Sequence, residues 1–347
     1  MTSGSYAQPV GPFRHDYDLS HCNTLKLVSR ALGGMEITGL ADIMALDELS
    51  ARQMLPLYIL GGGSNVVLAE EIDGLIGLMR IRERTLRETG THFIVTAGAG
   101  EVWDDVVRWT VDLGIGGLEN LAGIPGTAGA APVQNIGAYG VQLSDVFHEL
   151  TAFDRKARQL IRFDRQACAF SYRHSVFKHE PGRYIIVSVS LALPRDWTAN
   201  CQYPGLEQLG SAPSPAAVFA AVTALRGSKL PDWRRLGNAG SFFHNPIVAP
   251  AIAEAIAGGP RYPQDDGRIK LSAGWLIEQC GLKGTRLGPV GMYEGHALVL
   301  VNHGLSTTHR DVEALARLVT ERVRQRFGVT LQQEPVVFGN PMMPKRA

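Results

Sequence analysis

Short apolar runs set the pattern of the first two hundred residues. They predict strands at Leu57–Leu60, Phe93–Ala97, Val146–Phe153, Leu160–Phe163 and Arg183–Leu193. Between Glu101 and Leu113, valine, leucine and tryptophan recur at helical spacing, and Gly114 stands where a helix C-terminal cap is expected. This part of the chain therefore indicates strands separated by glycine loops, with a buried helix among them.

The pattern changes near residues 200–230, beyond which helices alternate with strands. Ser214 and Pro215 are a suitable N-cap and first residue for a helix that passes through Leu225 and is stopped by Gly227. The other elements predicted in this half are helices at Ala249–Ala257, at Ala273–Gly281 after the cap Ser272, and from the Thr308–Asp311 capping box to Phe327 before Gly328, with a buried strand at Ala297–Val301.

Length and charge narrow the choice of function. At about 150 residues per domain, 347 residues suffice for two or three domains. The formal net charge of +1 gives no overall field toward nucleic acid or membrane, so an anionic ligand must be held by local groups. Residues 1–20 hold no apolar core of signal-peptide length, and we expect a flexible tail there. The longest apolar stretches fall far short of a membrane span.

The cysteines and several absent motifs exclude further classes. No CxxC pair occurs among Cys22, Cys168, Cys201 and Cys280, so we expect reduced thiols and a cytoplasmic protein. There is no Gly-Lys dipeptide for a P-loop, no GxGxxG after a strand, no HExxH and no GxSxG. The histidines show no metal-ligand spacing, so we expect no metal site. A dinucleotide, if used, must be held without a Rossmann motif.

Two glycine-rich segments carry candidate chemistry. Residues Gly61, Gly62, Gly63, Ser64 and Asn65 directly follow an apolar strand, and consecutive small residues let backbone N–H groups converge on an anion such as a pyrophosphate. A flexible turn explains this loop about as well. The longer segment from Gly117 to Gly140 is nearly uncharged and glycine-spaced, which suits a surface against a flat ligand or a tightly packed inter-domain loop.

These segments, in order with Ser171–Ser175, Gly237–Pro246, Ala273–Gly284 and Leu331–Glu334, carry a family resemblance. The glycine segments resemble the FAD-binding domain of the vanillyl-alcohol-oxidase superfamily. From about Thr24 to Gly339, the chain more closely resembles the UDP-N-acetylenolpyruvoylglucosamine reductases, also called UDP-N-acetylmuramate dehydrogenases. The resemblance implies an α+β fold, in which an FAD-binding domain of two α+β subdomains precedes a C-terminal α+β substrate-binding domain.

The resemblance also implies a domain plan and partners. We expect a tail at 1–20, an FAD-binding domain at 21–195 split near 70–80, a connecting segment at 196–228, a substrate-binding domain at 229–328 and a returning segment at 329–347. The loop Leu193–Leu206, hereafter the tyrosine loop, resembles that of the longer subtype, in which it closes over substrate. We expect a monomer that binds neither nucleic acid nor membrane.

The family implies that NADPH, non-covalent FAD and an enolpyruvyl ether of a UDP-sugar take part in peptidoglycan precursor synthesis. Hydride delivery to the terminal methylene leaves negative charge beside a carboxylate, so the site needs a cation and an acid. By resemblance Ser241 is the proton donor, Arg173 holds the carboxylate or the flavin edge, and Glu334 polarises the carboxylate or shares its proton. Each residue also has an ordinary structural explanation. Ser241 could simply cap or turn a loop, Arg173 could form a salt bridge at the end of a strand, and Glu334 could be a solvated carboxylate.

The remaining site residues follow from the same resemblance. Cofactor contacts are implied for residues 61–65 and for Ile124, Pro125, Gly126, Val133, Gln134, Ile136, Gly137 and Arg226. Substrate contacts are implied for Tyr139, Tyr203, Lys229, Asn245 and His296. Two positions depart from the family pattern: His296 replaces an expected amide side chain, and Pro335-Val336 replaces a Val-Arg pair that would supply a cation near the flavin.

Two alternatives stay open at this point. A superfamily oxidase often binds flavin covalently, but residues 60–65 contain no histidine or cysteine for that bond. The other alternative is a protein that binds flavin or a nucleotide sugar without catalysis. The joint presence of Arg173, Ser241 and Glu334 argues against it.

Overall fold

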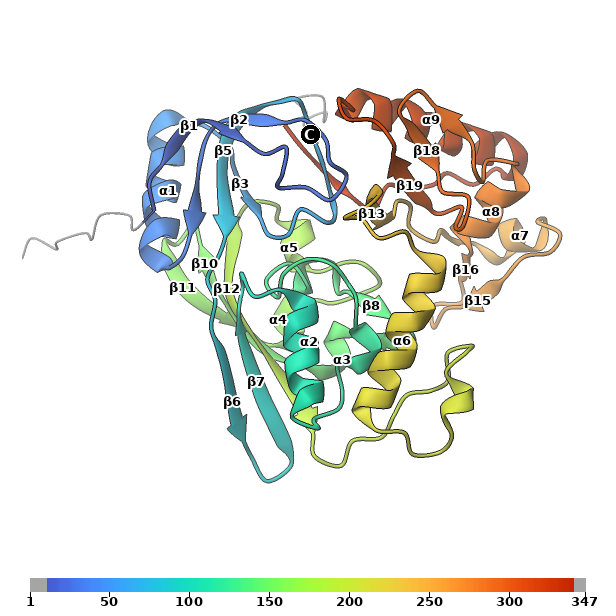
Figure 1. The fold of residues 1–347 in the computed structure, drawn as a ribbon, viewed down its shortest axis with the longest axis horizontal. Helices are drawn as coiled ribbons and strands as arrows, with labels where there is room; N and C mark the ends of the chain where they lie inside the picture. The colour runs from blue at the N-terminus through green and yellow to red at the C-terminus, as the bar shows by residue number, and fades with distance from the viewer. Residues whose placement is uncertain (1–10, 340–347) are drawn as a thin grey trace, which may run out of the picture. The chain divides into compact units, whose positions relative to one another are not determined.

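The structure, a computed structural model, describes residues 11–339 (Figure 1). The chain divides into two compact units. Of the described residues, the first unit contains 11–17, Ala31–Gly62 and Asp73–Ser228; the second contains Asp18–Arg30, Gly63–Ile72 and 229–339. The first glycine loop is thus shared, with Gly61 and Gly62 in the first unit and Gly63 to Asn65 in the second.

One sheet of the first unit is four-stranded, in the order β1-β2-β5-β3. Its strands are β1 (Arg14–Asp18), β2 (Arg30–Ile37), β3 (Leu57–Leu60) and β5 (Glu71–Met79), and helix α1 (Leu40–Gln53) connects β2 to β3. Strands β3 and β5 are parallel, with Leu57 opposite Leu75. Six consecutive residues at the end of β5 are buried, because parallel strands are covered on both faces.

The other large sheet of this unit is antiparallel, in the order β11-β10-β12-β7-β6. Its strands are β6 (Arg84–Glu88), β7 (His92–Gly98), β10 (Phe147–Asp154), β11 (Gln159–Phe163) and β12 (Tyr184–Pro194). In Figure 1 the β6–β7 hairpin extends well beyond its neighbours. Short elements line the connections: η1 (Glu119–Leu121), η2 (Pro132–Gln134), β8 (Gly137–Ala138), β9 (Val141–Gln142), α3 (Leu143–Val146), α4 (Arg165–Cys168), α5 (Val176–His179) and η3 (Glu207–Leu209).

Two helices complete the hydrophobic core of the first unit. Helix α2 (Trp103–Asp112) buries Trp103, whose indole N–H donates to the Leu121 carbonyl at 3.0 Å. Helix α6 (Pro215–Lys229) buries Val218 and Val222 in the same core. The Arg108 guanidinium of α2 lies 4.8 Å from the ring centre of Phe219 on α6, so the helices are neighbours. The segment Gly117–Gly140 contributes buried residues to the same core, among them Leu118 and Leu121.

The second unit has its own core. Sheet β13-β19-β18-β17 packs against α8 (Ala273–Gln279) and α9 (His309–Phe327), which bury Leu276, Ile277, Leu315 and Val319. The strands of this unit are β4 (Val66–Leu68), β13 (Gly237–Ser241), β14 (Ile247–Val248), β15 (Arg261–Pro263), β16 (Ile269–Leu271), β17 (Arg286–Leu287), β18 (Val290–Met292), β19 (Val299–Asn302) and β20 (Val336–Phe338), with a further helix α7 (Pro250–Glu254). Strands β4 and β20 pair in parallel.

Most predicted elements are confirmed, and the helix caps are confirmed in detail. The Ser272 hydroxyl accepts the Trp275 N–H at 3.2 Å, Asp311 accepts the Thr308 N–H at 2.9 Å, and Gly328 ends α9 in the left-handed region. Among residues 11–339, no helix has the length and apolar character that a membrane span requires.

Three predictions were wrong in their bounds. Helix α6 passes through Gly227 to Lys229, because an exposed helical glycine costs only about 1 kcal/mol whereas Pro231 restricts the residue before it. Helix α7 ends at Glu254, ahead of two left-handed glycines. Part of the expected tail, Arg14–Asp18, is strand β1; residues 1–10 lie outside the described residues.

Candidate cofactor and catalytic sites

In the first unit, the backbones of the two glycine segments are in direct contact. A Cβ at Gly61 would lie 2.4 Å from the Thr127 hydroxyl oxygen, and one at Gly62 would lie 2.9 Å from the Gly126 Cα. Neither distance leaves room for a side chain. The glycines are therefore required for this approach, which brings the backbone of Gly126 beside the first loop. Such a cradle of bare backbone fits a dinucleotide, whose phosphates need converging N–H groups.

The side chain of Asn120, in the longer glycine segment, has an oxygen that accepts no hydrogen bond within the described part of the chain. The residue is fully buried, and its amide nitrogen donates to the carbonyls of Tyr139 and Asn200, both at 2.9 Å. Within residues 11–339, the Asn120 Oδ1 atom has no hydrogen-bond partner. A buried acceptor of this kind is costly unless a bound group or an ordered water donates to it. This is a second feature that fits a ligand with N–H donors.

Arg173 is held in a strained backbone conformation, with φ of 53°. Its guanidinium donates to the Gly137 carbonyl at 3.0 Å, and a Cβ at Gly137 would lie 3.4 Å from the guanidinium. Lys178 donates to the Arg173 carbonyl, which closes the turn. Left-handed backbone at a non-glycine residue is uncommon and persists where the surroundings impose it. The structure thus brings Arg173, a predicted catalytic residue, to the segment that carries many of the predicted cofactor residues.

Arg226, Tyr139 and Tyr203 form a second group in this unit. The rings of Tyr139 and Tyr203 meet edge to face, with centroids 4.7 Å apart. Burial lowers the pKa of the Arg226 guanidinium, and the nearby Tyr139 and Asp104 act in the opposite direction. Burial likewise raises the pKa of Tyr139, while Arg226 lowers it. A half-buried guanidinium beside a phenol group can bind an oxyanion.

The other predicted cofactor residues of this unit support the segment itself. The Val133 carbonyl accepts the Ser175 hydroxyl at 2.6 Å, which ties the segment to the turn after Arg173. Ile136 is buried in the core, whereas Ile124 and Val133 pack at its edge. Pro125 and Gln134 lie in the same segment. In the second unit, Gly63 is left-handed, and a Cβ there would meet the Cys22 carbonyl at 1.9 Å; Ser64 follows it.

In the second unit, Ser241 ends strand β13 at an irregularity. The register with β19 shifts between Asn238 and Ser241, and Gly240 is left-handed. Asn238 holds this bulge, because its Oδ1 accepts the Gly240 N–H at 3.0 Å and its amide donates to the Leu236 carbonyl at 2.8 Å. Bulges commonly re-aim a side chain next to an active site. Ser241 thus follows a left-handed glycine at a shifted register.

In the same unit, the backbone of Glu334 pairs with Phe242, the residue that follows Ser241. Its backbone N–H donates to the Phe242 carbonyl at 2.9 Å, and its carboxylate lies 3.6 Å from the His244 ring nitrogen Nδ1. Asn65 contacts the start of strand β20, since its backbone carbonyl accepts the Val336 N–H at 3.0 Å. The pairing of Phe243 with Gln333 thus places Glu334 opposite the residue next to Ser241.

The predicted substrate contacts of this unit lie near helix α8. The Asn245 side-chain oxygen accepts the Ala273 N–H at 2.9 Å, at the start of the helix. The His296 Nδ1 atom accepts the Leu298 N–H at 3.2 Å. Burial lowers the pKa of His296, and the charges of Lys229 and Lys283 add to this effect. A neutral ring that accepts at Nδ1 carries its proton on Nε2, so His296 offers an N–H donor as an amide would.

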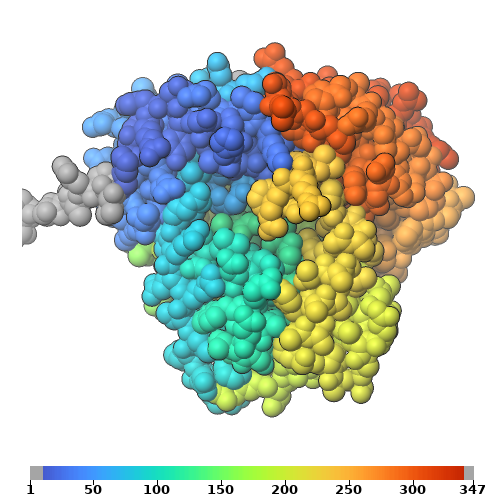
Figure 2. Space-filling model, viewed as in Figure 1, coloured from blue at the N-terminus to red at the C-terminus, as the bar shows by residue number. Residues whose placement is uncertain are grey.

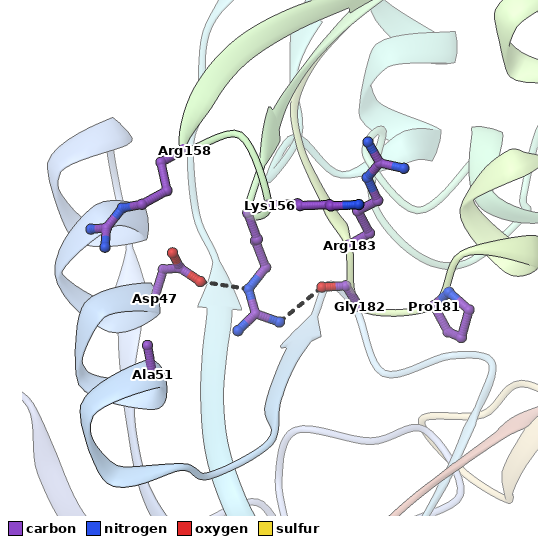
Figure 3. A pocket seen from close by; sticks show the side chains of 8 residues that line it. Asp47, Ala51, Lys156, Arg158, Pro181, Gly182 and Arg183 are labelled. Carbon is purple, nitrogen blue, oxygen red and sulfur yellow. Dashed lines mark hydrogen bonds and ion pairs between the residues drawn. The ribbon is translucent and has the colours of Figure 1, made fainter. Parts of the chain in front are cut away.

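A groove of about 520 Å³ in the first unit is lined by other residues (Figure 3). It is lined by Asp47, Ala51, Arg155, Lys156, Arg158, Pro181, Gly182 and Arg183. Arg155 donates to Asp47 at 2.6 Å and to the Gly182 carbonyl at 2.8 Å, and Arg183 is paired with Asp154. Arg155 and Arg183 are thus paired with protein acceptors, and no predicted site residue lines the groove.

Three residues near the candidate site were missed from the sequence. His244 contacts Glu334, Glu119 is a buried carboxylate, and Trp197 donates to it at 3.1 Å. A signal existed for Glu119, because it is the only charged residue between Gly117 and Gly140. His244 lies within a motif that carries the resemblance, but only the strand pairing places it against Glu334.

The fold and the glycine cradle define a class, the FAD-binding proteins that carry a second α+β domain. The sequence model of an FAD binding domain matches residues 37–161, and that of the C-terminal domain of UDP-N-acetylenolpyruvoylglucosamine reductase matches residues 232–338. The chain belongs to the family of UDP-N-acetylenolpyruvoylglucosamine reductases, which confirms the resemblance and the expected fold class and makes the chain an FAD-dependent oxidoreductase.

Relatives establish this membership. The reductase of Bordetella pertussis is 48% identical over 341 residues, which cover 95% of this chain and 97% of the relative. That of Pseudomonas aeruginosa is 47% identical over 86% of this chain and 91% of its own. A crystal structure of the Thermus caldophilus reductase shares the fold, with a TM-score of 0.65 and 24% identity over 94% of this chain and 98% of that one.

Proposed function

We propose that this protein reduces the enolpyruvyl group of UDP-N-acetylglucosamine enolpyruvate to UDP-N-acetylmuramate, a step in peptidoglycan precursor synthesis, with FAD as carrier and NADPH as hydride donor. The observation that carries the proposal is the 48% identity to a named reductase across 95% of the chain. The glycine cradle and the undonated Asn120 oxygen support the cofactor, because both fit a dinucleotide.

The reaction divides between the cofactor and the side chains. FAD, when bound, supplies the hydride for the terminal methylene carbon. We assign Arg173 to the negative charge that then spreads toward the substrate carboxylate, since a guanidinium fork matches a carboxylate. The strained backbone at Arg173 supports this assignment, because strain of this kind concentrates at functional sites.

We assign the proton transfer to Ser241, assisted by Glu334. A serine hydroxyl is a weak acid, so neighbours must stabilise the charge that develops when its proton leaves. Glu334 is suited to share that proton or to polarise the substrate carboxylate. The nearby His244 supplies a group that can balance the charge of Glu334. The bulge held by Asn238 supports the assignment, since it fixes the serine without using its hydroxyl.

We assign the remaining contacts by the chemistry of the groups. Arg226, Tyr203 and Tyr139 suit a diphosphate or the edge of the cofactor, and Lys229 adds a cation near His296. Asn245 and His296 would offer amide and imidazole N–H groups to the sugar or the carboxylate. Cofactor contacts are assigned to residues 61–65, Ile124, Pro125, Gly126, Val133, Gln134, Ile136 and Gly137.

One anaerobic experiment tests the proposal. The bound flavin is reduced with NADPH, excess nucleotide is removed, and UDP-N-acetylglucosamine enolpyruvate is added while flavin absorbance is followed. We expect rapid return of the oxidised spectrum. Flavin that stays reduced until air enters would move the function toward an oxidase, and flavin that acid precipitates with the protein would indicate a covalent bond. Absence of any flavin spectrum after FAD addition would overturn the proposal.

We propose further that the enzyme works in the cytoplasm as a monomer and thereby serves cell-wall growth, cell shape and division. The four free cysteines support a reducing compartment. Fractionation of cells and light scattering of the purified protein test location and oligomeric state. Recovery in a membrane or secreted fraction, or the mass of a dimer, would contradict this proposal.

A further inference from the structure

The tyrosine loop is attached to the segment Gly117–Gly140 at three points. The Trp197 indole N–H donates to Glu119 Oε1 at 3.1 Å, and the indole ring covers Gly116, where a Cβ would lie 2.3 Å from it. Asn200 follows, with its carbonyl accepting from Asn120 at 2.9 Å. Tyr203, at the end of the loop, rests against Tyr139. Figure 2 shows the end of this loop on the surface beside helix α6.

The hydrogen bond between Trp197 and Glu119 depends on a buried carboxylate. The Glu119 side chain is buried, with 2% of its surface exposed, and its other oxygen accepts the Gly117 N–H at 2.5 Å. Burying a carboxylate is costly unless hydrogen bonds compensate. Burial raises the pKa of Glu119, and the bonds from Gly117 and Trp197 oppose that rise. The two oxygens of this carboxylate therefore join the segment, at Gly117, to the tyrosine loop, at Trp197.

We propose that Glu119 is a positioning residue: through Trp197 it fixes the base of the tyrosine loop and so sets where Tyr203 stands against Tyr139. This inference rests on the proposed function, in which Tyr203 contacts the diphosphate of the substrate. Glu119 has no part in hydride or proton transfer. A loosened loop base must be ordered again each time substrate binds, and that cost weakens binding rather than the chemical step.

The test uses the full-length protein with FAD and three variants: Glu119→Gln, Trp197→Phe and the double variant. The Gly117 and Trp197 donors bond to different oxygens of Glu119, and glutamine keeps only one of these oxygens, so the two bonds cannot both be kept in the present geometry. Phenylalanine keeps most of the ring over Gly116 but removes the donor. The flavin is reduced with dithionite and mixed with increasing UDP-N-acetylglucosamine enolpyruvate while reoxidation is followed.

We expect the substrate concentration for half-maximal reoxidation to rise about tenfold, equivalent to about 1.4 kcal/mol, in both single variants. The limiting rate should stay within about twofold of the parent rate. The double variant should be no weaker than the more affected single variant, because both substitutions act on the same Glu119–Trp197 anchor. Two independent, additive losses, or an unchanged half-saturating concentration, would overturn the inference.

A second readout needs no substrate. Hydrogen exchange of a peptide covering residues 195–206 should be faster in Glu119→Gln and Trp197→Phe than in the parent. Asp154→Asn is the matched control, because Asp154 is another buried carboxylate of the first unit but is bonded to Arg183; it should leave exchange in this peptide unchanged. Unchanged exchange in both anchor variants would contradict the inference. Failure of the parent to be reoxidised would instead contradict the proposed function.

Discussion

The ring nitrogen Nδ1 of His244 lies 3.6 Å from the carboxylate of Glu334. The contact arises because the strand after Ser241 pairs with the segment before Pro335, with Phe243 opposite Gln333. Both side chains are largely buried, at 17% and 11% exposure, so their interaction is less screened than a surface ion pair. The chain lacks the arginine expected after Glu334, and His244 brings another ionisable group to that carboxylate.

Replacing His244 should therefore impair turnover. We expect His244→Gln to lower the limiting rate of flavin reoxidation about fivefold, since a partly buried pair contributes about 1 kcal/mol. Stopped-flow absorbance with dithionite-reduced enzyme measures this rate. His303→Gln, at an exposed position of the same unit, is the control and should behave as the parent. Equal rates in the two variants would remove His244 from the reaction.

Ser241→Ala should have a larger effect on the same rate. Loss of a general acid costs about 10²–10⁴ in the protonation step, and alanine leaves the bulge held by Asn238 intact. The substrate concentration for half-maximal reoxidation should change little. Single-turnover measurements over a range of substrate concentrations test this expectation. Ser306→Ala, in the exposed turn before α9, is the control. A normal limiting rate in Ser241→Ala would exclude the serine as proton donor.

Local sequence signals were sufficient to predict those helices whose ends carry capping residues. Helix α9 was predicted because a capping box and a terminal glycine bracket a regular apolar face. Helix α1 was missed, since it begins after Gly39 without a polar side-chain cap and its apolar face is weakly patterned. Strands β2 and β5 were missed as well, because glycines interrupt both and because pairing with distant strands decides their conformation.

The candidate site was predictable as motifs but not as contacts. The glycine segments were found from composition, and the structure adds that Gly62 must be glycine because Gly126 lies against it. Glu119 and Trp197 are 78 residues apart, so their hydrogen bond depends on the tertiary fold. The pairing of His244 with Glu334 likewise requires two segments that the sequence separates widely.

The contact between the glycine segments gives a prediction for cofactor binding. A Cβ at Gly62 would lie 2.9 Å from the Gly126 Cα, so Gly62→Ala must displace backbone. Overpacking of this kind costs about 1–3 kcal/mol, and we expect FAD affinity to fall at least about tenfold. Fluorescence titration of the apoprotein with FAD measures the loss. Gly90→Ala is the control, since nothing lies within 4 Å of a Cβ there. Similar affinities in both variants would show that this contact does not shape the cofactor site.

His296 gives a prediction for pH dependence. Its pKa is lowered in the folded protein, so between that lowered value and about 6.5 the unfolded chain binds more protons than the native state. The contribution of His296 to the free energy of unfolding is therefore present above about pH 6.5 and is lost as pH falls through the lowered pKa. Chemical denaturation between about pH 5 and 8 should show a weaker pH dependence in His296→Gln than in the parent.

His296 also gives a prediction for substrate binding. Because glutamine restores an amide at this position, we expect the half-saturating substrate concentration at pH 7.5 to stay within about threefold of the parent value. His296→Ala should raise that concentration about tenfold, because it removes the N–H donor. Equal half-saturation in the glutamine and alanine variants would show that the His296 side chain does not contact the substrate.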